Sequence, residues 1–335
     1  MDIDAAEFMN EPNRLEFSGA PTGYTAADYA RGQDLFFGWV REHYPKCLLV
    51  GPCTTGDPSL SCNGEKSLSA GLGSIVSTCT TDALMDGTTI RPTVFSYHYY
   101  NGISERGASF APGSHCPAEA ARTDEYLSVA PGCAKSHLPL RDKYVPGGQM
   151  WVTESGDAGA GGDTWASTYL DVFRTLNELG SFATITDGVI FHNTLASSDY
   201  GFLEHGTYAP RPNYYAVLLW NRLMGTEVYD CANPNVEGAH VYCHSRRDCK
   251  KGVVYLVINN SLTEPTIVEL PEKTEQYILS AETIRSAVIR INGVSLKLND
   301  WMEHGKISPP RSRGGGRSCL LPDAAVFCDI VQSIS

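Results

Sequence analysis

The chain has 335 residues, of which 42% are hydrophobic and 19% are charged. That balance excludes a disordered chain, and the length is enough for two domains with a buried core. The formal net charge of −12 argues against a general nucleic-acid-binding protein, because such proteins present basic surfaces. No run approaches the roughly 20 apolar residues of a membrane-spanning helix, so the sequence predicts no transmembrane segment.

Eleven cysteines are scattered along the chain, a usage typical of proteins that mature in an oxidising compartment. Their spacing does not resemble a zinc site. Cys243, His244 and Cys249 come closest, but no second pair of ligands lies beside them in the sequence. We therefore expect scattered disulfides with at least one unpaired thiol, no bound metal and no cofactor.

The first ten residues lack the basic start and the apolar run of a signal peptide. This conflicts with the cysteine content, which favours a secreted, extracellular or lysosomal protein. The simplest expectation that satisfies both is that the natural N-terminus lies upstream of Met1.

Residues 1–228 alternate between short apolar runs and longer segments with helical spacing. Such alternation predicts an α/β domain of parallel strands with helices outside. Residues 103–148 interrupt the pattern and are expected to be a loop-rich insertion. The predicted strands lie near 5–9, 47–51, 93–99, 149–154 and 188–194, and the predicted helices at 25–43, 70–85, 164–179 and 213–225.

The pattern of apolar and polar residues changes near residue 229. From there to residue 335, short apolar runs are separated by turn residues, and no strong helical signal appears. This pattern predicts a second, all-β domain over 229–335, with the architecture of a β-sandwich. A basic, glycine-rich stretch at 311–318 is expected to be a loop within it.

Two glutamates lie where a predicted strand ends. Glu11 follows the first strand within Asn10-Glu11-Pro12-Asn13, and Glu154 ends the fourth strand within Trp151-Val152-Thr153-Glu154-Ser155. In barrels of alternating strands and helices, this end of the strands carries the active site. Two carboxylates from separate strands are what glycoside hydrolysis requires, because one must donate a proton while the other is ionised.

The Asn-Glu-Pro-Asn motif resembles the acid/base motif of the (β/α)8 retaining glycosidases. Within that clan the chain resembles the heparanase-like family, glycoside hydrolase family 79, whose members are β-glucuronidases. The resemblance runs from about residue 3 to 330 and begins at the fourth strand of the barrel. It implies a partial (β/α)8 barrel followed by a sandwich. Further segments that carry it are 96–102, 151–155, 159–162, 198–203, 212–226, 289–293 and 320–322.

The resemblance implies a role for each matching residue. Glu11 would be the general acid/base and Glu154 the nucleophile of a retaining glycosidase that acts on β-linked glucuronic acid. Asn10 would bind the 2-hydroxyl group of the sugar. The substrate would be a glucuronate-containing glycan or a smaller glucuronide.

Five further residues are implied to line the pocket. His98 and Tyr100 are two apart on a strand, so they face the same side and would orient the nucleophile. The backbone N–H groups of Gly161 and Gly162, with the hydroxyl of Tyr200, would bind the glucuronate carboxylate. Glycine suits such a site, since a side chain would block the close approach of the backbone.

Two alternatives stay open. Because the first three βα units of the family are absent, the chain could be a non-catalytic fragment or a carbohydrate-binding pseudoenzyme. It could also be a same-clan retaining glycosidase for a neutral sugar, which would keep both glutamates without the carboxylate-binding group. The cationic clusters Arg246–Arg247 and Lys250–Lys251 fall in the predicted sandwich, and we interpret them as solvated loop charge.

Overall fold

The structure is a computed structural model in which the chain divides into two compact units, each taken by itself below. It describes residues 2–14, 18–60, 79–109, 115–230, 237–270, 274–296, 316–320, 322 and 324–331. The first unit consists of Met1–Cys116, Ser128–Ala160 and Ile185–Asn193, and the second of Pro117–Leu127, Gly161–Thr184 and Thr194–Ser335. The predicted domains 1–228 and 229–335 stay predictions.

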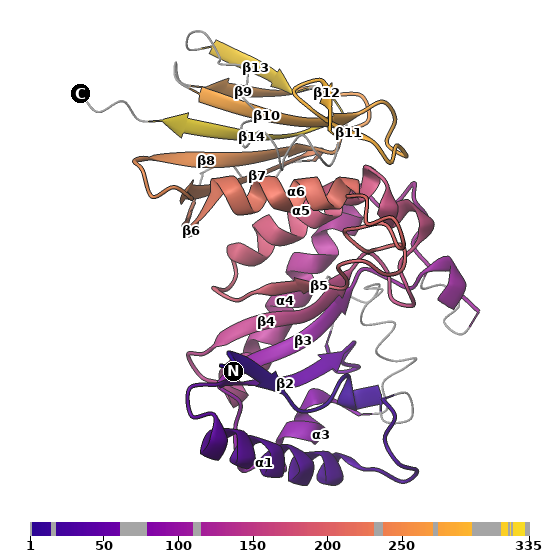
Figure 1. Ribbon diagram of the computed structural model, residues 1–335, viewed down its shortest axis with the longest axis vertical. Helices are drawn as coiled ribbons and strands as arrows, with labels where there is room; N and C mark the ends of the chain where they lie inside the picture. Colours follow the sequence, from indigo (N-terminus) through magenta and orange to yellow (C-terminus); the bar gives the residue numbers. More distant parts are fainter. Residues whose placement is uncertain are drawn as a thin grey trace. The chain divides into compact units, whose positions relative to one another are not determined.

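The first unit contains a curled sheet of five parallel strands, which confirms the predicted α/β fold with its half-barrel sheet (Figure 1). Each strand lies where the sequence predicts one. In the described residues β1 and β5 form the two edges, so the sheet stays open. In sheet order the strands are β1 (Ala5–Glu7), β2 (Leu48–Thr55), β3 (Val94–Tyr100), β4 (Gln149–Gly156) and β5 (Ile190–His192).

Helix α1 (Ala26–His43) packs its apolar face on the sheet. It begins with a capping box, in which Thr25 and Asp28 satisfy each other's backbone N–H groups. Its Phe37 side chain is fully buried in a cluster with Leu49 of β2. The helix predicted for 70–85 is present as α3 (Thr81–Met85), and residues 70–78 lie outside the described part of the chain.

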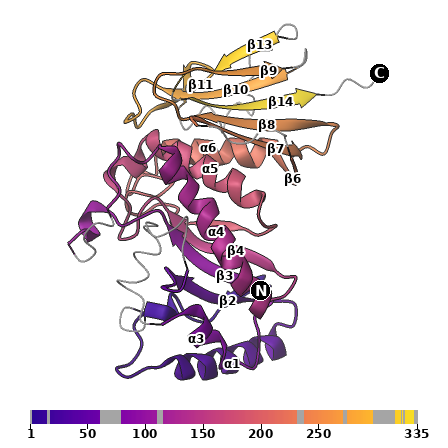
Figure 2. The same ribbon diagram turned by 180° about the vertical axis from the view of Figure 1, so that it is seen from behind.

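The expectation of a loop-rich insertion at 103–148 is wrong for much of its length. A 21-residue helix, α4 (Asp124–Tyr144), crosses it after a 3-10 turn at Glu105–Gly107. Pro131 and Pro139 lie inside this helix. Because proline is rare in helix interiors, the helical spacing was not recognised in the sequence. Its His137 ring stacks on Tyr97 of β3 with ring centroids 3.9 Å apart, and both ribbon views show α4 beside β3 and β4 (Figures 1 and 2).

The second unit is built on a seven-stranded antiparallel sheet in the order β12-β11-β10-β14-β8-β7-β6, with a separate two-stranded sheet of β13 and β9. That these sheets stack as a sandwich stays a prediction. The strands are β6 (Met224–Tyr229), β7 (Ala239–Arg246), β8 (Gly252–Asn259), β9 (Thr266–Leu270), β10 (Thr274–Ala281), β11 (Ile289–Ile291), β12 (Val294–Ser295), β13 (Gly316–Leu320) and β14 (Ala324–Val331).

Two helices pack on that sheet. After a 3-10 turn at Thr164–Ser167, α5 (Leu170–Ala183) and α6 (Pro212–Leu223) bury Phe173 and Leu219 in one cluster with Leu256 of β8. α5 is buried along most of its length, and it also carries a shielded ion cluster. There the guanidinium of Arg174 pairs with Asp171 at 2.6 Å and with Glu178 at 2.5 Å.

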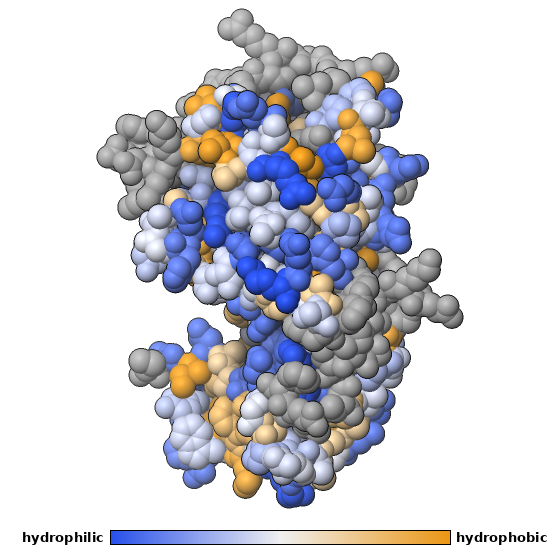
Figure 3. Space-filling view, turned by 90° about the vertical axis from the view of Figure 1, so that its right-hand side faces the viewer, coloured by the Kyte–Doolittle hydropathy of each residue, from blue (hydrophilic) through white to orange (hydrophobic). Residues whose placement is uncertain are grey.

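None of the described helices is long and apolar enough to cross a membrane. The exposed hydrophobic side chains include Leu35 and Trp39 on α1, which are 77% and 48% exposed. On the face drawn in Figure 3, hydrophobic residues form small patches among hydrophilic ones.

The close approach of α5 to β7 gives a stability prediction. A Cβ atom at Gly180 would overlap the ring of Tyr242, which is buried and donates its hydroxyl to Asn177 Oδ1 at 2.7 Å. Gly180→Ala should therefore lower the free energy of unfolding by about 1–3 kcal/mol in urea denaturation. Gly38→Ala in α1 is the control: its Cβ would lie 3.6 Å from Ile90, so the helix propensity of alanine should stabilise by up to about 1 kcal/mol. A gain in stability at both sites would contradict the packing argument.

Candidate active site

The C-terminal ends of three strands of the same parallel sheet in the first unit bring together His98 and the two predicted catalytic glutamates. Glu11 follows β1, His98 lies in β3 and Glu154 lies in β4. The β3–β4 register shifts between Tyr97 and His98, and this irregularity sets His98 opposite Glu154. Since the strands are parallel, these ends share one edge of the sheet.

The imidazole of His98 lies between the two carboxylates. Its Nδ1 atom is 3.1 Å from Glu11 Oε1 and 3.7 Å from Glu154 Oε2. One oxygen of each carboxylate and the ring nitrogen all lie within 4.8 Å of one another. Glu11 and His98 are buried, whereas the side chain of Glu154 is 27% exposed. Solvent therefore reaches the carboxylate of Glu154, whereas that of Glu11 is enclosed by the protein.

Glu154 is held by two further side chains. The hydroxyl of Tyr100 donates to Glu154 Oε1 at 2.5 Å, and Asn193 Nδ2 contacts the same oxygen at 3.1 Å. Asn193 also contacts the Tyr100 hydroxyl at 2.9 Å, so the three groups form a closed triangle. The sequence reasoning identified Tyr100 but missed Asn193. Asn193 directly follows β5, at the same edge of the sheet, and this position is the sequence signal by which it could have been found.

Glu11 has a second cationic partner that the sequence reasoning missed. Arg14 Nη1 lies 2.6 Å from Glu11 Oε2, within the 3-10 turn Pro12–Arg14 that follows the motif. Burial raises the pKa of Glu11, but the hydrogen bond and charge of His98 and the guanidinium of Arg14 lower it, and the net direction is downward. Glu11 is therefore ionised near neutral pH in this structure.

Two overlapping sets of side chains bring metal-ligating atom types within 4.8 Å of one another. One set is Glu11, His98 and Glu154, and the other is Glu7, Cys53 and His98. Both depend on His98, whose Nε2 atom lies 3.2 Å from Cys53 Sγ and whose Nδ1 contacts Glu11. Hydrogen bonding within the protein therefore already uses both ring nitrogens.

Gly161, Gly162 and Tyr200 lie together in the second unit. Both glycines have positive φ, 91° and 76°, and a Cβ on Gly162 would come within 2.7 Å of the backbone nitrogen of Tyr200. The N–H of Asp199 donates to the carbonyl of Gly161 at 3.0 Å. Asn10, the remaining predicted binding residue, is exposed beside Glu11 in the first unit.

The expected disulfides are not confirmed. Cys47, Cys53, Cys249 and Cys328 carry free thiols in the structure. Cys62 and Cys231 lie outside the described residues.

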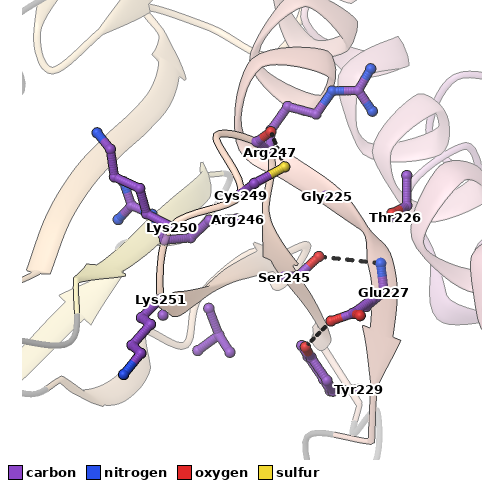
Figure 4. Close-up of a pocket in the computed structure, with 12 residues that line it drawn as sticks. Gly225, Thr226, Glu227, Tyr229, Ser245, Arg246, Arg247, Cys249, Lys250 and Lys251 are labelled. Atoms are coloured by element: carbon purple, nitrogen blue, oxygen red, sulfur yellow. Dashed lines mark hydrogen bonds between the residues drawn. The ribbon is translucent and has the colours of Figure 1, made fainter.

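A cavity of about 660 Å³ lies elsewhere, in the second unit, between β6 and the turn from β7 to β8 (Figure 4). Its lining includes Arg246, Arg247, Lys250 and Lys251. Arg246 is paired with Asp248 through two contacts of 3.0 Å. The labelled side chains of Arg247, Lys250 and Lys251 extend in different directions and do not converge. This is the arrangement expected of charges that are solvated by water.

Solved glycoside hydrolases share this fold. A glycoside hydrolase family 44 endoglucanase from Clostridium acetobutylium superposes with a TM-score of 0.63 at 13% identity, covering 98% of this chain and 66% of that one. At this identity the likeness shows the fold alone. No family model matches the chain.

Relatives in sequence are more specific. The chain is 31% identical over 157 residues to baicalin-β-D-glucuronidase of Scutellaria baicalensis, covering 44% of this chain and 30% of the relative. It is 36% identical over 137 residues to heparanase-like protein 1 of Arabidopsis thaliana, covering 41% and 25%. An inactive heparanase-2 of Homo sapiens is 23% identical over 216 residues, covering 57% and 36%.

The chain is therefore a relative of heparanase-like proteins and of a β-glucuronidase, which confirms the resemblance predicted from its motifs. It spans about a third or less of the length of the first two of these relatives.

The Glu11–Arg14 pair gives a pH-dependent stability prediction. A carboxylate whose pKa is lowered by folding stabilises the native state above its unfolded pKa, and that contribution is lost as the pH falls through the folded pKa. Arg14→Met should reduce the free energy of unfolding by about 1–2 kcal/mol near neutral pH, with a smaller deficit in acid. Urea denaturation at a series of pH values measures this difference.

Arg31→Met is the matched control, because Arg31 pairs with Asp28 on the exposed surface of α1. That variant should show no comparable pH-dependent deficit. A deficit in Arg14→Met that is constant from neutral to acidic pH would contradict the role of the Glu11 charge.

Proposed function

We propose that the protein that carries this chain is a retaining glycoside hydrolase acting on β-linked glucuronic acid. The observation that carries the proposal is the approach of the Glu11 and Glu154 carboxylates, with oxygens within 4.8 Å and His98 between them. Retaining enzymes keep their carboxyl groups about 5–5.5 Å apart, while inverting enzymes need about 6.5–9.5 Å to admit a water molecule. The short spacing favours retention.

In the proposed first step, a carboxylate oxygen of Glu154 forms a bond to the anomeric carbon. The bond from that carbon to the leaving oxygen breaks, and the leaving oxygen takes a proton from Glu11. In the second step, water attacks the anomeric carbon and gives its proton to Glu11, while the bond to Glu154 breaks. Glu11 thus ends the cycle protonated again.

The partners of Glu154 suit a nucleophile. Tyr100 and Asn193 both contact Oε1, which leaves Oε2 as the oxygen turned toward His98 and the substrate side. Holding one oxygen fixes the direction of the other, and positioning of this kind lowers the entropic cost of attack. The same contacts disperse negative charge until the bond to the sugar forms.

The lowered pKa of Glu11 sets the expected pH range. A general acid must carry a proton, and the fraction of Glu11 that is protonated shrinks as the pH rises above its pKa. Turnover should therefore be fastest in acidic solution. Of the proposed locations, which are secreted, extracellular or lysosomal, an acidic optimum would suit the lysosome.

Leaving-group dependence separates the two carboxylates. Glu154→Ala should abolish turnover of every substrate, because no nucleophile remains. Glu11→Ala should lose about 10²–10⁴-fold on alkyl glucuronides but much less on aryl glucuronides with good leaving groups, which need little proton donation. Steady-state kinetics on both substrate types measures this, and equal losses in Glu11→Ala would contradict its role as the acid.

Recognition of the glucuronate carboxylate is proposed for Gly161, Gly162 and Tyr200. Both glycines have positive φ, a conformation that favours glycine, and Tyr200 packs directly against Gly162. Hydrogen bonds to a carboxylate contribute about 1.5–3 kcal/mol each. The relationship to a protein named as a glucuronidase supports this substrate class.

Substrate charge tests that assignment. Tyr200→Phe should lower kcat/KM on an aryl β-glucuronide by roughly one to two orders of magnitude and barely change it on the matching glucoside. Tyr208→Phe is the control, since Tyr208 belongs to the same unit and is 61% exposed. Equal losses on both substrates would reassign the protein as a general retaining β-glycosidase.

The second candidate function is a non-catalytic carbohydrate-binding relative. It is favoured by the open sheet, since a (β/α)8 barrel needs eight strands and the described sheet has five.

We propose that the active form closes the sheet with three further βα units at the edges of β1 and β5. A panel of aryl glycosides distinguishes the candidates: turnover of glucuronides, of neutral glycosides, or of neither.

A further inference from the structure

Cys53 occupies an unusual backbone position at the edge of the candidate site. It is the extra residue where the β2–β3 register shifts between Pro52 and Thr54, which makes it a β-bulge. Its φ is 60°, in the left-handed region, and its side chain is only 2% exposed.

That conformation favours glycine, because a Cβ atom in the left-handed region crowds the backbone. A cysteine there carries a conformational cost that glycine would avoid. Side chains kept in strained backbone positions cluster where the side chain is used. The contacts of Cys53 indicate what its side chain does.

The bulge is tied to the sheet on one side and to His98 on the other. The N–H of Cys53 donates to Ser96 Oγ at 3.1 Å, and Ser96 in turn donates to Glu7 Oε1 at 2.8 Å. The sulfur lies 3.2 Å from His98 Nε2. The backbone of Cys53 is thus anchored, and its side chain has a fixed point from which to hold the imidazole.

We infer that Cys53 is a positioning residue for the carboxylate pair: its sulfur holds His98 through Nε2, so that Nδ1 stays turned to Glu11 and Glu154. Nδ1 lies 3.1 Å from Glu11 and 3.7 Å from Glu154, so a modest rotation of the ring would lose one contact or both. The catalytic consequence rests on the proposed glycosidase function, whereas the positioning of the ring does not.

A thiol suits this position in either protonation state of the ring. Burial raises the pKa of Cys53, so it is a neutral thiol near neutral pH. It can donate its S–H to a bare Nε2, or its sulfur can accept from Nε2–H. Serine offers the same two roles through a shorter bond, while alanine and glycine offer neither.

The first test reads the ring itself. Nitrogen-15 NMR of histidine-labelled chain reports the hydrogen bonding of each ring nitrogen, and His98→Gln assigns the signal. Cys53→Ala and Cys53→Gly should shift the Nε2 signal of His98, and Cys53→Ser should restore much of the original shift. Cys53→Gly removes the sulfur without keeping the backbone strain, so a folded sample is expected even if Cys53→Ala unfolds.

Cys47→Ala is the matched control. It is also a buried cysteine of this unit, but the hydrogen bond of its thiol goes to the carbonyl of Leu48 and not to a ring nitrogen. It should leave the His98 signals in place. Unchanged His98 signals in Cys53→Ala and Cys53→Gly would overturn the inference.

The second test measures hydrolysis of an aryl β-glucuronide by the protein that carries this chain. Cys53→Ala and Cys53→Gly should lower kcat about tenfold with little change in KM, and Cys53→Ser should recover part of the loss. Unchanged kcat together with a displaced His98 signal would overturn the link to catalysis. Absence of turnover in the unsubstituted protein would instead count against the proposed function and leave the NMR result standing.

Discussion

The carboxylates of Glu11 and Glu154 are held so close that they repel each other when both are ionised. Their arrangement therefore depends on the cationic groups that contact them. His98 supplies a ring nitrogen to both, and Arg14 adds a full positive charge on the far oxygen of Glu11. Desolvation lowers the pKa of His98, but its contacts raise it well above the ordinary value. Because Cys53 stays a neutral thiol, the anions that favour a protonated ring are Glu11 and Glu154.

The parallel sheet is what makes this pairing available to residues far apart in the chain. Glu11, His98 and Glu154 come from three strands whose ends share one edge, and Asn193 joins them directly after a fourth. Each side chain has a different partner on its remaining polar atom, so none depends on the others alone. As a result, Arg14 holds Glu11 on one side of His98, and Tyr100 and Asn193 hold Glu154 on the other.

Much of this could be predicted from the sequence because it follows local patterns. Five strands of alternating βα texture and a Glu at two strand ends are visible in the letters alone, and the His-Tyr-Tyr run places His98 and Tyr100 on one face. Helix α4 was missed because Pro131 and Pro139 break the pattern by which helices are recognised, although tertiary packing tolerates them. Arg14 and Asn193 were missed because arginine after a turn and asparagine after a strand are common in any protein.

Cys53 could not have been found in the sequence, because its position depends on irregular backbone geometry at the edge of the sheet. Register shifts occur between Pro52 and Thr54 and between Tyr97 and His98, and left-handed backbone occurs at Glu11 and Cys53. Each is an exception to the regular strand geometry on which sequence reasoning relies. All of them lie next to His98. Regular strands at these positions would point successive side chains to opposite faces of the sheet. The sheet supplies a rigid frame, and the irregularities at its edge orient the side chains around His98.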